Sequence, residues 1–219
     1  DLPGDPCSSV CPNKIEGGAG GQEWHIRKEH HEQDRGQQNG IAVAKAPNEG
    51  LHELQGGVMI HRKADCLIGQ QKAEELGYSQ LLWLDGVEHK YIDEVGAMNV
   101  FFVIDGVVIT PELTDGNILP GVTRASCIEV LKAHGYKVEE RKISIDEVKE
   151  AHKNGTLTES FGTGTAAVIS PVGEYIDGDE HIIINNNEIG PVAQFLYDEL
   201  TGIQWGKIED KNGWIVKVN

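Results

Sequence analysis

The sequence has few positive charges, few cysteines and no long hydrophobic run. Its 219 residues include 19 Lys and Arg against 35 Asp and Glu, which gives a net charge of −16. Nucleic acids and anionic membrane surfaces are bound mainly through basic patches, so we expect neither as a main partner. No apolar stretch approaches the roughly 18 residues of a membrane span, and no signal-peptide segment opens the chain. The sequence therefore predicts neither membrane insertion nor secretion.

The four cysteines are too few for a dense disulfide framework, so we expect reduced thiols in a cytoplasmic protein. Cys7 and Cys11, followed by His25 and His30, do approach the spacing of a two-Cys, two-His zinc site. A zinc finger also needs a small apolar core between its ligand pairs. The interval here holds four glycines and no aromatic residue before Trp24. We therefore expect a chance spacing and no metal site.

Hydrophobic residues are scarce in the first part of the chain. Residues 1–66 contain 10 Leu, Ile, Val and Phe, whereas residues 67–219 contain 47. Chains with so low a share struggle to bury a core. We therefore divide the chain into an unmatched N-terminal segment, residues 1–66, for which we expect no compact fold and allow for disorder, and a folded domain, residues 67–219.

The folded domain alternates helix and strand patterns, which predicts the α/β (α+β) class. Helices are expected at 67–76, around 127–131, at 145–154 and at 191–200, with a Ser144–Glu147 capping box opening the third and Pro191 opening the last. Strands are expected at 80–84, 98–103, 107–110 and 137–141, and as a hairpin over 176–184. We also expect a glycine-threonine loop from Phe161 leading into a short strand, and a small strand at 214–218.

One stretch places a carboxylate beside a buried strand. Glu94 precedes the apolar-rich run Met98–Val103, in which Asn99 is the only polar side chain. Such a run is typical of a strand buried on both faces. A carboxylate at the start of this strand would be poorly solvated and would need a cationic or protonated partner. The alternative is a strand that merely follows two acidic residues.

Two further segments could bind a phosphate. Gly121-Val122-Thr123 precedes a predicted helix, whose free N–H groups and dipole favour an anion. Gly162-Thr163-Gly164-Thr165 offers close backbone approach and two hydroxyls. Either segment alone is weak evidence, but a phosphate site together with a buried acid fits pyridoxal 5′-phosphate, whose ring nitrogen needs an acid.

The same residues carry a resemblance to a known family. From about Gln70 the chain resembles the large C-terminal domain of branched-chain amino acid aminotransferases, the fold-type IV pyridoxal phosphate enzymes. The matching segments are Ala73–Gly86, Glu94–Phe102, Ile118–Arg124, Phe161–Ala166 and Asn187–Pro191. The resemblance implies that fold, amino transfer between leucine, isoleucine or valine and 2-oxoglutarate, and small amino acids and 2-oxo acids as substrates.

The resemblance also implies a role for individual residues. Glu94 matches the glutamate that pairs with the pyridine nitrogen of the cofactor. The positions that match the contacts to the cofactor phosphate are Val122, Thr123, Gly164 and Thr165. Those that approach the substrate carboxylate are Ala97 and Ala166. The family often has threonine at the Ala97 position, so one hydrogen-bond donor is missing here.

The family's Schiff-base lysine is not found. It stands in a Lys-x-Gly-Gly-Asn-Tyr motif, and counting back from Gln70 places it at Val58, where the motif is absent. Lys63 is the nearest lysine, but it occupies the tyrosine position and is a doubtful substitute. Without the lysine the enzyme loses its covalent anchor and the base that moves the α-proton. The catalytic residue is therefore unknown, and we expect this chain to be inactive.

Several interpretations remain open at this point. The chain descends from the branched-chain aminotransferases, or it is a non-catalytic remnant or mistranslated fragment in which residues 1–66 arise from a frameshift. A third interpretation keeps the fold and changes the chemistry, as in D-amino acid aminotransferase or aminodeoxychorismate lyase. The resemblance also implies a homodimer.

Overall fold

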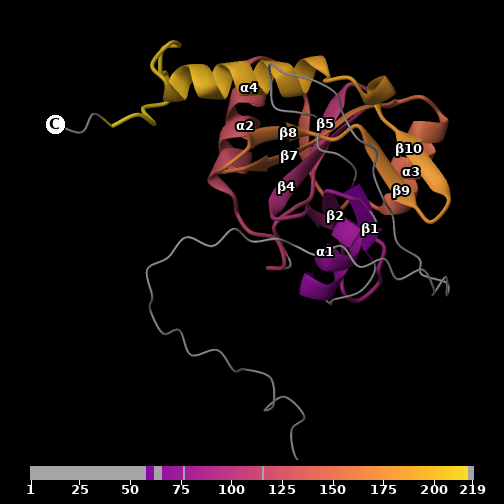
Figure 1. The fold of residues 1–219 in the computed structure, drawn as a ribbon. Coiled ribbons are helices and arrows are strands. Elements are labelled where there is room, and N and C mark those ends of the chain that lie inside the picture. The colour runs from indigo at the N-terminus through magenta and orange to yellow at the C-terminus, as the bar shows by residue number, and fades with distance from the viewer. Residues whose placement is uncertain (1–57, 62–65, 76, 115, 217–219) are drawn as a thin grey trace, which may run out of the picture. The chain divides into compact units, whose positions relative to one another are not determined.

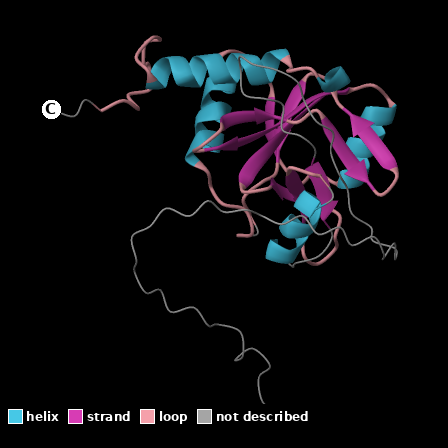
Figure 2. Cartoon of the chain, viewed as in Figure 1, coloured by secondary structure: helices cyan, strands magenta, loops and turns pink. Residues whose placement is uncertain are grey.

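The computed structural model describes residues 58–61, 66–75, 77–114 and 116–216, which all belong to one structural unit (Figure 1). The cysteines and histidines with zinc-like spacing, Lys63 and most of the predicted N-terminal segment lie outside the described residues. The described part forms helices packed on a large mixed sheet (Figure 2).

The described chain mixes helices and strands, as the predicted α/β (α+β) class requires, and includes two runs of four consecutive strands. The helices are α1 Cys66–Glu75, α2 Val122–Ala133, α3 Ile145–Lys153, the short 3₁₀ turn η1 Asn185–Asn187, and α4 Pro191–Gln204. The first strands are β1 Val58–His61, β2 Gln80–Leu84, β3 Ile92–Val95, β4 Met98–Ile104 and β5 Val107–Thr110. The later strands are β6 Val138–Glu140, β7 Leu157–Gly164, β8 Val168–Pro171, β9 Glu174–Asp177 and β10 Glu180–Ile183.

Strand β4 is the centre of the sheet. The main path runs β10-β9-β1-β2-β3-β4-β5-β6, and β7 pairs with β4 and then with β8. Strand β7 covers one edge of β4 from Asn99 to Ile104. Because a strand has two edges, β3 and β5 share the other one, β3 at its start and β5 at its end. Three strands therefore meet on β4.

Strand β4 is buried on both faces, as its apolar run predicts. Val100 and Phe102 point into one core cluster, which includes side chains from α1 and α3. Phe101 and Val103 point into a second cluster, formed with α2 and α4. Helices α1 and α3 thus cover one face of the sheet, and α2 and α4 cover the other.

The predicted acid-bearing stretch is two strands and not one. Glu94 lies on β3, and Gly96 and Ala97 form the hairpin turn that leads into β4. Gly96 has a φ of +56° and lies against the side chain of Gln80, so only glycine fits there. The turn places Glu94 directly opposite Asn99, so the acid is still at the start of the buried strand.

Two other expectations are wrong. Residues 161–164 belong to strand β7 and not to a loop, because β4 and β8 bind both edges of this segment. Residues 214–216 form no strand, since no described strand pairs with them. The turn between β7 and β8 is limited to residues 165–167.

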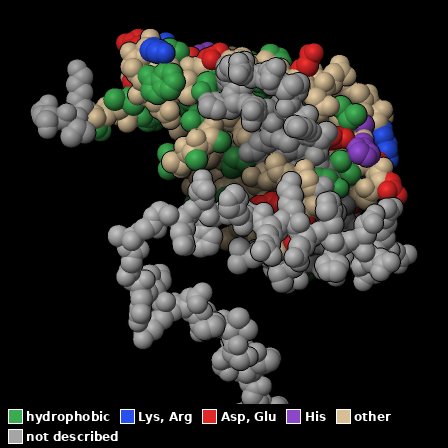
Figure 3. Space-filling model, in the orientation of Figure 1, with side chains coloured by type: hydrophobic (Ala, Val, Ile, Leu, Met, Phe, Trp, Pro, Cys, Tyr) green, Lys and Arg blue, Asp and Glu red, His purple; other side chains and the backbone are tan. Residues whose placement is uncertain are grey.

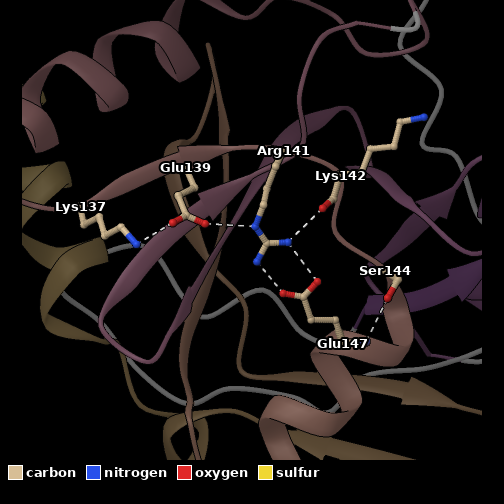
Figure 4. Close-up of polar contacts among 6 residues, drawn as sticks. All are labelled: Lys137, Glu139, Arg141, Lys142, Ser144 and Glu147. Atoms are coloured by element: carbon tan, nitrogen blue, oxygen red, sulfur yellow. Dashed lines mark hydrogen bonds and ion pairs between the residues drawn. The ribbon is translucent and has the colours of Figure 1, made fainter.

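The start of α3 shows how the predicted capping box is modified. The hydroxyl of Ser144 accepts a hydrogen bond from the Glu147 amide at 3.1 Å, as expected. The carboxylate of Glu147 instead binds the guanidinium of Arg141, which also contacts Glu139 (Figure 4). Lys137 extends this surface network through Glu139. The carboxylate therefore joins α3 to the segment that follows β6.

Several large apolar side chains are exposed near the C-terminal end of the described chain (Figure 3). They include Trp205, Trp214, Ile215 and Val216. None of the helices in the described ranges combines the length and apolarity needed to cross a lipid bilayer.

Candidate functional site

Three polar residues form a row across three neighbouring strands. Glu94 of β3 pairs with Asn99 of β4, and Asn99 pairs with Thr163 of β7. Directly paired residues in antiparallel strands point to the same face of a sheet. The next pair on that face, Phe101 and Phe161, stacks with ring centroids 5.3 Å apart in the α2/α4 core. The polar row thus lies at the edge of that core.

Glu94 is a half-buried carboxylate with few hydrogen bonds. Its Oε1 accepts from the Leu119 amide at 3.2 Å and from the Asn99 side-chain amide at 3.4 Å. Burial raises the pKa of Glu94, the Leu119 amide partly offsets this, and the neighbouring Asp93 raises the pKa further. Among the described residues no ion pair of Glu94 is found. A cationic partner would reverse the shift and stabilise the charged carboxylate.

The turn that leads into α2 lies against this row. Asn99 donates to the Leu119 carbonyl at 2.9 Å, and a Cβ on Gly121 would lie only 2.2 Å from the Asn99 Oδ1. Gly121 is the N-cap residue, and no side chain caps the helix. The first turn of α2 contains no acidic residue. Its free N–H groups therefore remain available to an anion.

A buried arginine fixes the first turn of α2 from the other side. The Nη2 of Arg124 donates to the Pro111 carbonyl at 2.9 Å and to Glu140 at 3.0 Å. Its guanidinium thus points away from the helix start. This geometry ties α2 to the end of the β5 strand and to β6.

The remaining predicted positions lie at the same end of the sheet. Because β4 and β7 are antiparallel, the hairpin residue Ala97 and the turn after Gly164 are neighbours. Gly164 packs on Met98, where a Cβ would lie 3.1 Å from the Met98 Cγ. Thr165 and Ala166 are exposed in the turn. A larger residue at position 164 would therefore press tightly against the Met98 side chain.

A pocket of about 560 Å³ opens beside the start of α2. Gly121, Val122 and Thr123 form one wall, and Trp214 and Ile215 lie among the apolar lining residues. Glu94 does not line this pocket. The helix start therefore borders open space, and Glu94 contacts Leu119, two residues before Gly121.

The structure thus brings the described candidate residues to one end of the sheet: Glu94, Ala97, Val122, Thr123, Gly164, Thr165 and Ala166. Lys63 lies outside the described residues. Sequence reasoning missed the roles of Asn99 and Thr163. Asn99 carries a signal in the sequence, since it is the lone polar residue of an apolar run, whereas the glycine-threonine pattern around Thr163 predicts a loop.

The profile of one protein family, described as "Amino-transferase class IV", matches residues 30–175. This range begins upstream of residue 67, so the domain boundary predicted from composition stays a prediction.

The chain is also similar to curated proteins that are named as branched-chain aminotransferases. It is 57% identical over 175 residues to the "Probable branched-chain-amino-acid aminotransferase" of Staphylococcus aureus, covering 78% of this chain and 49% of the relative. It is 59% identical over 155 residues to "Branched-chain-amino-acid aminotransferase 2" of Bacillus subtilis, covering 71% of this chain and 42% of the relative. The chain spans about half the length of the curated relatives it matches.

The solved structures that this chain resembles are also branched-chain amino acid aminotransferases. The branched-chain amino acid aminotransferase of Escherichia coli matches with a TM-score of 0.58 at 35% identity, over 68% of this chain and 46% of that chain. The T.th. branched-chain amino acid aminotransferase, solved with N-(5'-phosphopyridoxyl)-L-glutamate, matches with a TM-score of 0.57 at 30% identity, over 69% and 47%. The same enzyme was also solved with pyridoxamine 5'-phosphate and with 4-methylvaleric acid.

Proposed function

Since the chain belongs to the class IV aminotransferases, we propose that its described domain binds pyridoxal 5′-phosphate between Glu94 and the start of α2. The observation that carries this proposal is the contact between Glu94 and the turn before an uncapped helix. An acceptor for the ring nitrogen and a set of donors for the phosphate thus lie side by side.

The residues present fit the cofactor chemically. Glu94 is an acid without a cationic partner among the described residues, and a protonated ring nitrogen would supply one. The Thr163 Oγ1 is buried and has no hydrogen-bond partner in the described structure, so the site retains an unused polar atom. The absence of a Cβ on Gly121 lets the turn before α2 lie directly against Asn99.

Each residue has a defined task in this proposal. Glu94 accepts a hydrogen bond from the ring nitrogen and keeps a proton on it. The amides of Val122 and Thr123 donate to the phosphate, and Gly164 and Thr165 donate from the opposite turn. When bound, the cofactor supplies a pyridinium ring that withdraws electrons from a bound amino acid. Ala97 and Ala166 border the substrate carboxylate.

We further propose amino acids related to leucine, isoleucine and valine as the ligand class, with 2-oxo acids as their counterparts. The names of the relatives and the 4-methylvaleric acid in the T.th. structure support this class. Activity itself requires a lysine, and no Lys-x-Gly-Gly-Asn-Tyr motif occurs in the 219 residues. We therefore propose that this chain binds the cofactor without catalysing amino transfer.

The binding proposal is tested with pyridoxamine 5'-phosphate, which needs no lysine. We expect Glu94→Gln to weaken its binding about 10-fold or more, because a neutral amide cannot hold a proton on the ring nitrogen. The measurement is isothermal titration calorimetry. The matched control is Asp93→Asn, which removes the adjacent acid from the other face of β3 and should bind within about 2-fold of the parent chain. Equal weakening in both variants would contradict the proposed role of Glu94.

The inactivity proposal has its own test. Pyridoxal 5′-phosphate added to the chain should give no absorption band that depends on Lys63, and leucine with 2-oxoglutarate should give no glutamate. A band that disappears in Lys63→Ala would overturn the proposal, because it would identify a working covalent anchor.

A further inference from the structure

Asn99 is a buried polar residue that touches both ends of the proposed cofactor site. Its side chain is 5% exposed, in a strand whose other interior residues are apolar. A buried amide needs hydrogen-bond partners for its donors and its acceptor, so these partners fix the position of the Asn99 side chain. The contacts of Asn99 described below are all with the protein itself, so they exist without a bound cofactor.

The side-chain amide nitrogen of Asn99 contacts two segments that are far apart in sequence. It donates to the Leu119 carbonyl at 2.9 Å, immediately before α2. It also donates to Glu94 Oε1 at 3.4 Å, on strand β3. The same carboxylate oxygen accepts from the Leu119 amide at 3.2 Å, so the three groups form a closed triangle. Movement of any one of them breaks two contacts.

The other atom of the amide contacts the helix start itself. The Asn99 Oδ1 occupies the space that a Cβ of Gly121 would fill. The backbone of Asn99 is in turn fixed by pairing with Glu94 on one side and Thr163 on the other. The rigid centre of the sheet thus determines where α2 begins.

We infer that Asn99 is a positioning residue that sets the spacing between the acid Glu94 and the anion-binding start of α2. This inference rests on the proposed function, because the two ends matter as a pair only if one ligand spans them. A ligand that engages both ends gains from having them held at a fixed separation before it binds. A ligand that engages one end gains nothing.

The inference is tested with one whole ligand and two fragments. Pyridoxamine 5'-phosphate spans both ends, inorganic phosphate engages only the helix start, and pyridoxamine engages only the acid. In Asn99→Ala we expect the dissociation constant of the whole ligand to rise about 10-fold or more, because the preorganised spacing is lost. Each fragment should change by less than about 3-fold.

The matched control is Thr110→Val. Thr110 is fully buried, and its hydroxyl donates to the Val100 carbonyl at 2.8 Å and to neither end of the proposed site. Asn99→Ala loses two side-chain hydrogen bonds and Thr110→Val loses one, so both variants should lose stability. Only Asn99→Ala should lose affinity for the whole ligand relative to the fragments.

Asn99→Asp separates hydrogen bonding from packing. It has nearly the same size, but its carboxylate cannot donate to Leu119 and repels Glu94. The affinity of Asn99→Asp for pyridoxamine 5'-phosphate, divided by the affinity of the parent chain, should be low at pH 8. This ratio should rise towards pH 5, where a protonated carboxyl at position 99 donates again. A constant ratio over this range would overturn the role of the donor.

The outcomes distinguish a failure of the proposed cofactor binding from a failure of the positioning role of Asn99. If the parent chain does not bind pyridoxamine 5'-phosphate, the proposed function fails and the inference falls with it. If the parent chain binds and Asn99→Ala binds equally well, only the inference is overturned. Equal losses for the whole ligand and one fragment would also overturn it, because Asn99 would then act at a single end.

Discussion

At the scale of single residues, the site depends on close approach between Gly121 and Asn99. Gly121 has ordinary extended backbone angles, φ −66° and ψ 134°, so its backbone would accept any residue. Glycine is required by space alone, since a Cβ would meet the Asn99 Oδ1 at 2.2 Å. The Asn99 amide cannot swing aside without losing its bond to Leu119.

We therefore expect Gly121→Ala to lower the free energy of unfolding by about 1–3 kcal/mol, the usual cost of overpacking. In an Asn99→Ala background the same substitution should cost much less, because the clashing atom is gone, and the two changes should be non-additive. Urea denaturation of the four chains measures this coupling. The control is Gly86→Ala, where an added Cβ meets nothing within 4 Å. Additive costs would contradict the proposed contact.

At the scale of elements, the start of α4 depends on a buried carboxylate from β7. Glu159 accepts from the Val192 amide at 3.0 and 3.1 Å and from the Ala193 amide at 3.0 Å, at a helix end with no side-chain cap of its own. Burial raises the pKa of Glu159, and the two amides only partly offset this. The strand thereby fixes the position of α4 on the sheet.

The raised pKa of Glu159 predicts how stability changes with pH. From the ordinary value of 4.5 up to the raised pKa, the folded chain binds more protons than the unfolded chain. The contribution of Glu159 to the free energy of unfolding therefore falls as pH rises through this window and is constant above it.

Glu159→Gln removes this titration while keeping an acceptor for the α4 amides. We expect the difference in unfolding free energy, parent minus variant, to decrease as pH rises above 4.5. Urea denaturation across pH 4 to 8 measures it, and the raised pKa of Glu94 cancels because both chains contain it. A difference that grows with pH would contradict the assignment.

The elements were predictable where the signal is local. Gly77, Gly135 and Gly155 end helices with φ values of +87°, +81° and +71°, as their positions after apolar patterns predict. Pro191 begins α4, and Ser144 caps α3. The glycine-threonine end of strand β7 is not predictable in this way, because its stability comes from pairing with β4 and β8 and not from local propensity.

The candidate site is predictable only in part, because several of its contacts join residues that are far apart in the sequence. The resemblance identified Glu94 and the start of α2, and a lone asparagine in an apolar run is visible in the sequence. The triangle formed by Glu94, Asn99 and Leu119 joins residues up to 25 positions apart. Contacts of this kind follow from how the turn packs on the sheet, which no local pattern encodes.

At the scale of the whole molecule, one buried thiol reports on global unfolding. Cys127 lies on α2 with no exposed surface, inside the core that α2 forms with α4. Burial raises the pKa of its thiol to about 12. Reaction with an alkylating reagent therefore requires exposure of the core, because only the accessible thiolate is reactive.

We expect Cys127 to resist iodoacetamide in the native chain and to react in urea with the same midpoint as the loss of circular dichroism. Peptide mapping by mass spectrometry distinguishes it from the other three cysteines. Saturating pyridoxamine 5'-phosphate should slow the labelling further, since a ligand of the folded state reduces the unfolded population. Rapid native labelling would contradict the buried position.

The row formed by Glu94, Asn99 and Thr163 has a consequence for how this domain can evolve. Side chains in a strand alternate between faces, so deleting one residue within β7 would turn Thr163 away and bring a glycine onto the polar row. Length changes in the exposed turn at 165–167 leave that alternation intact. We therefore expect related sequences to vary in length at such turns and to keep an unbroken residue count through β4 and β7.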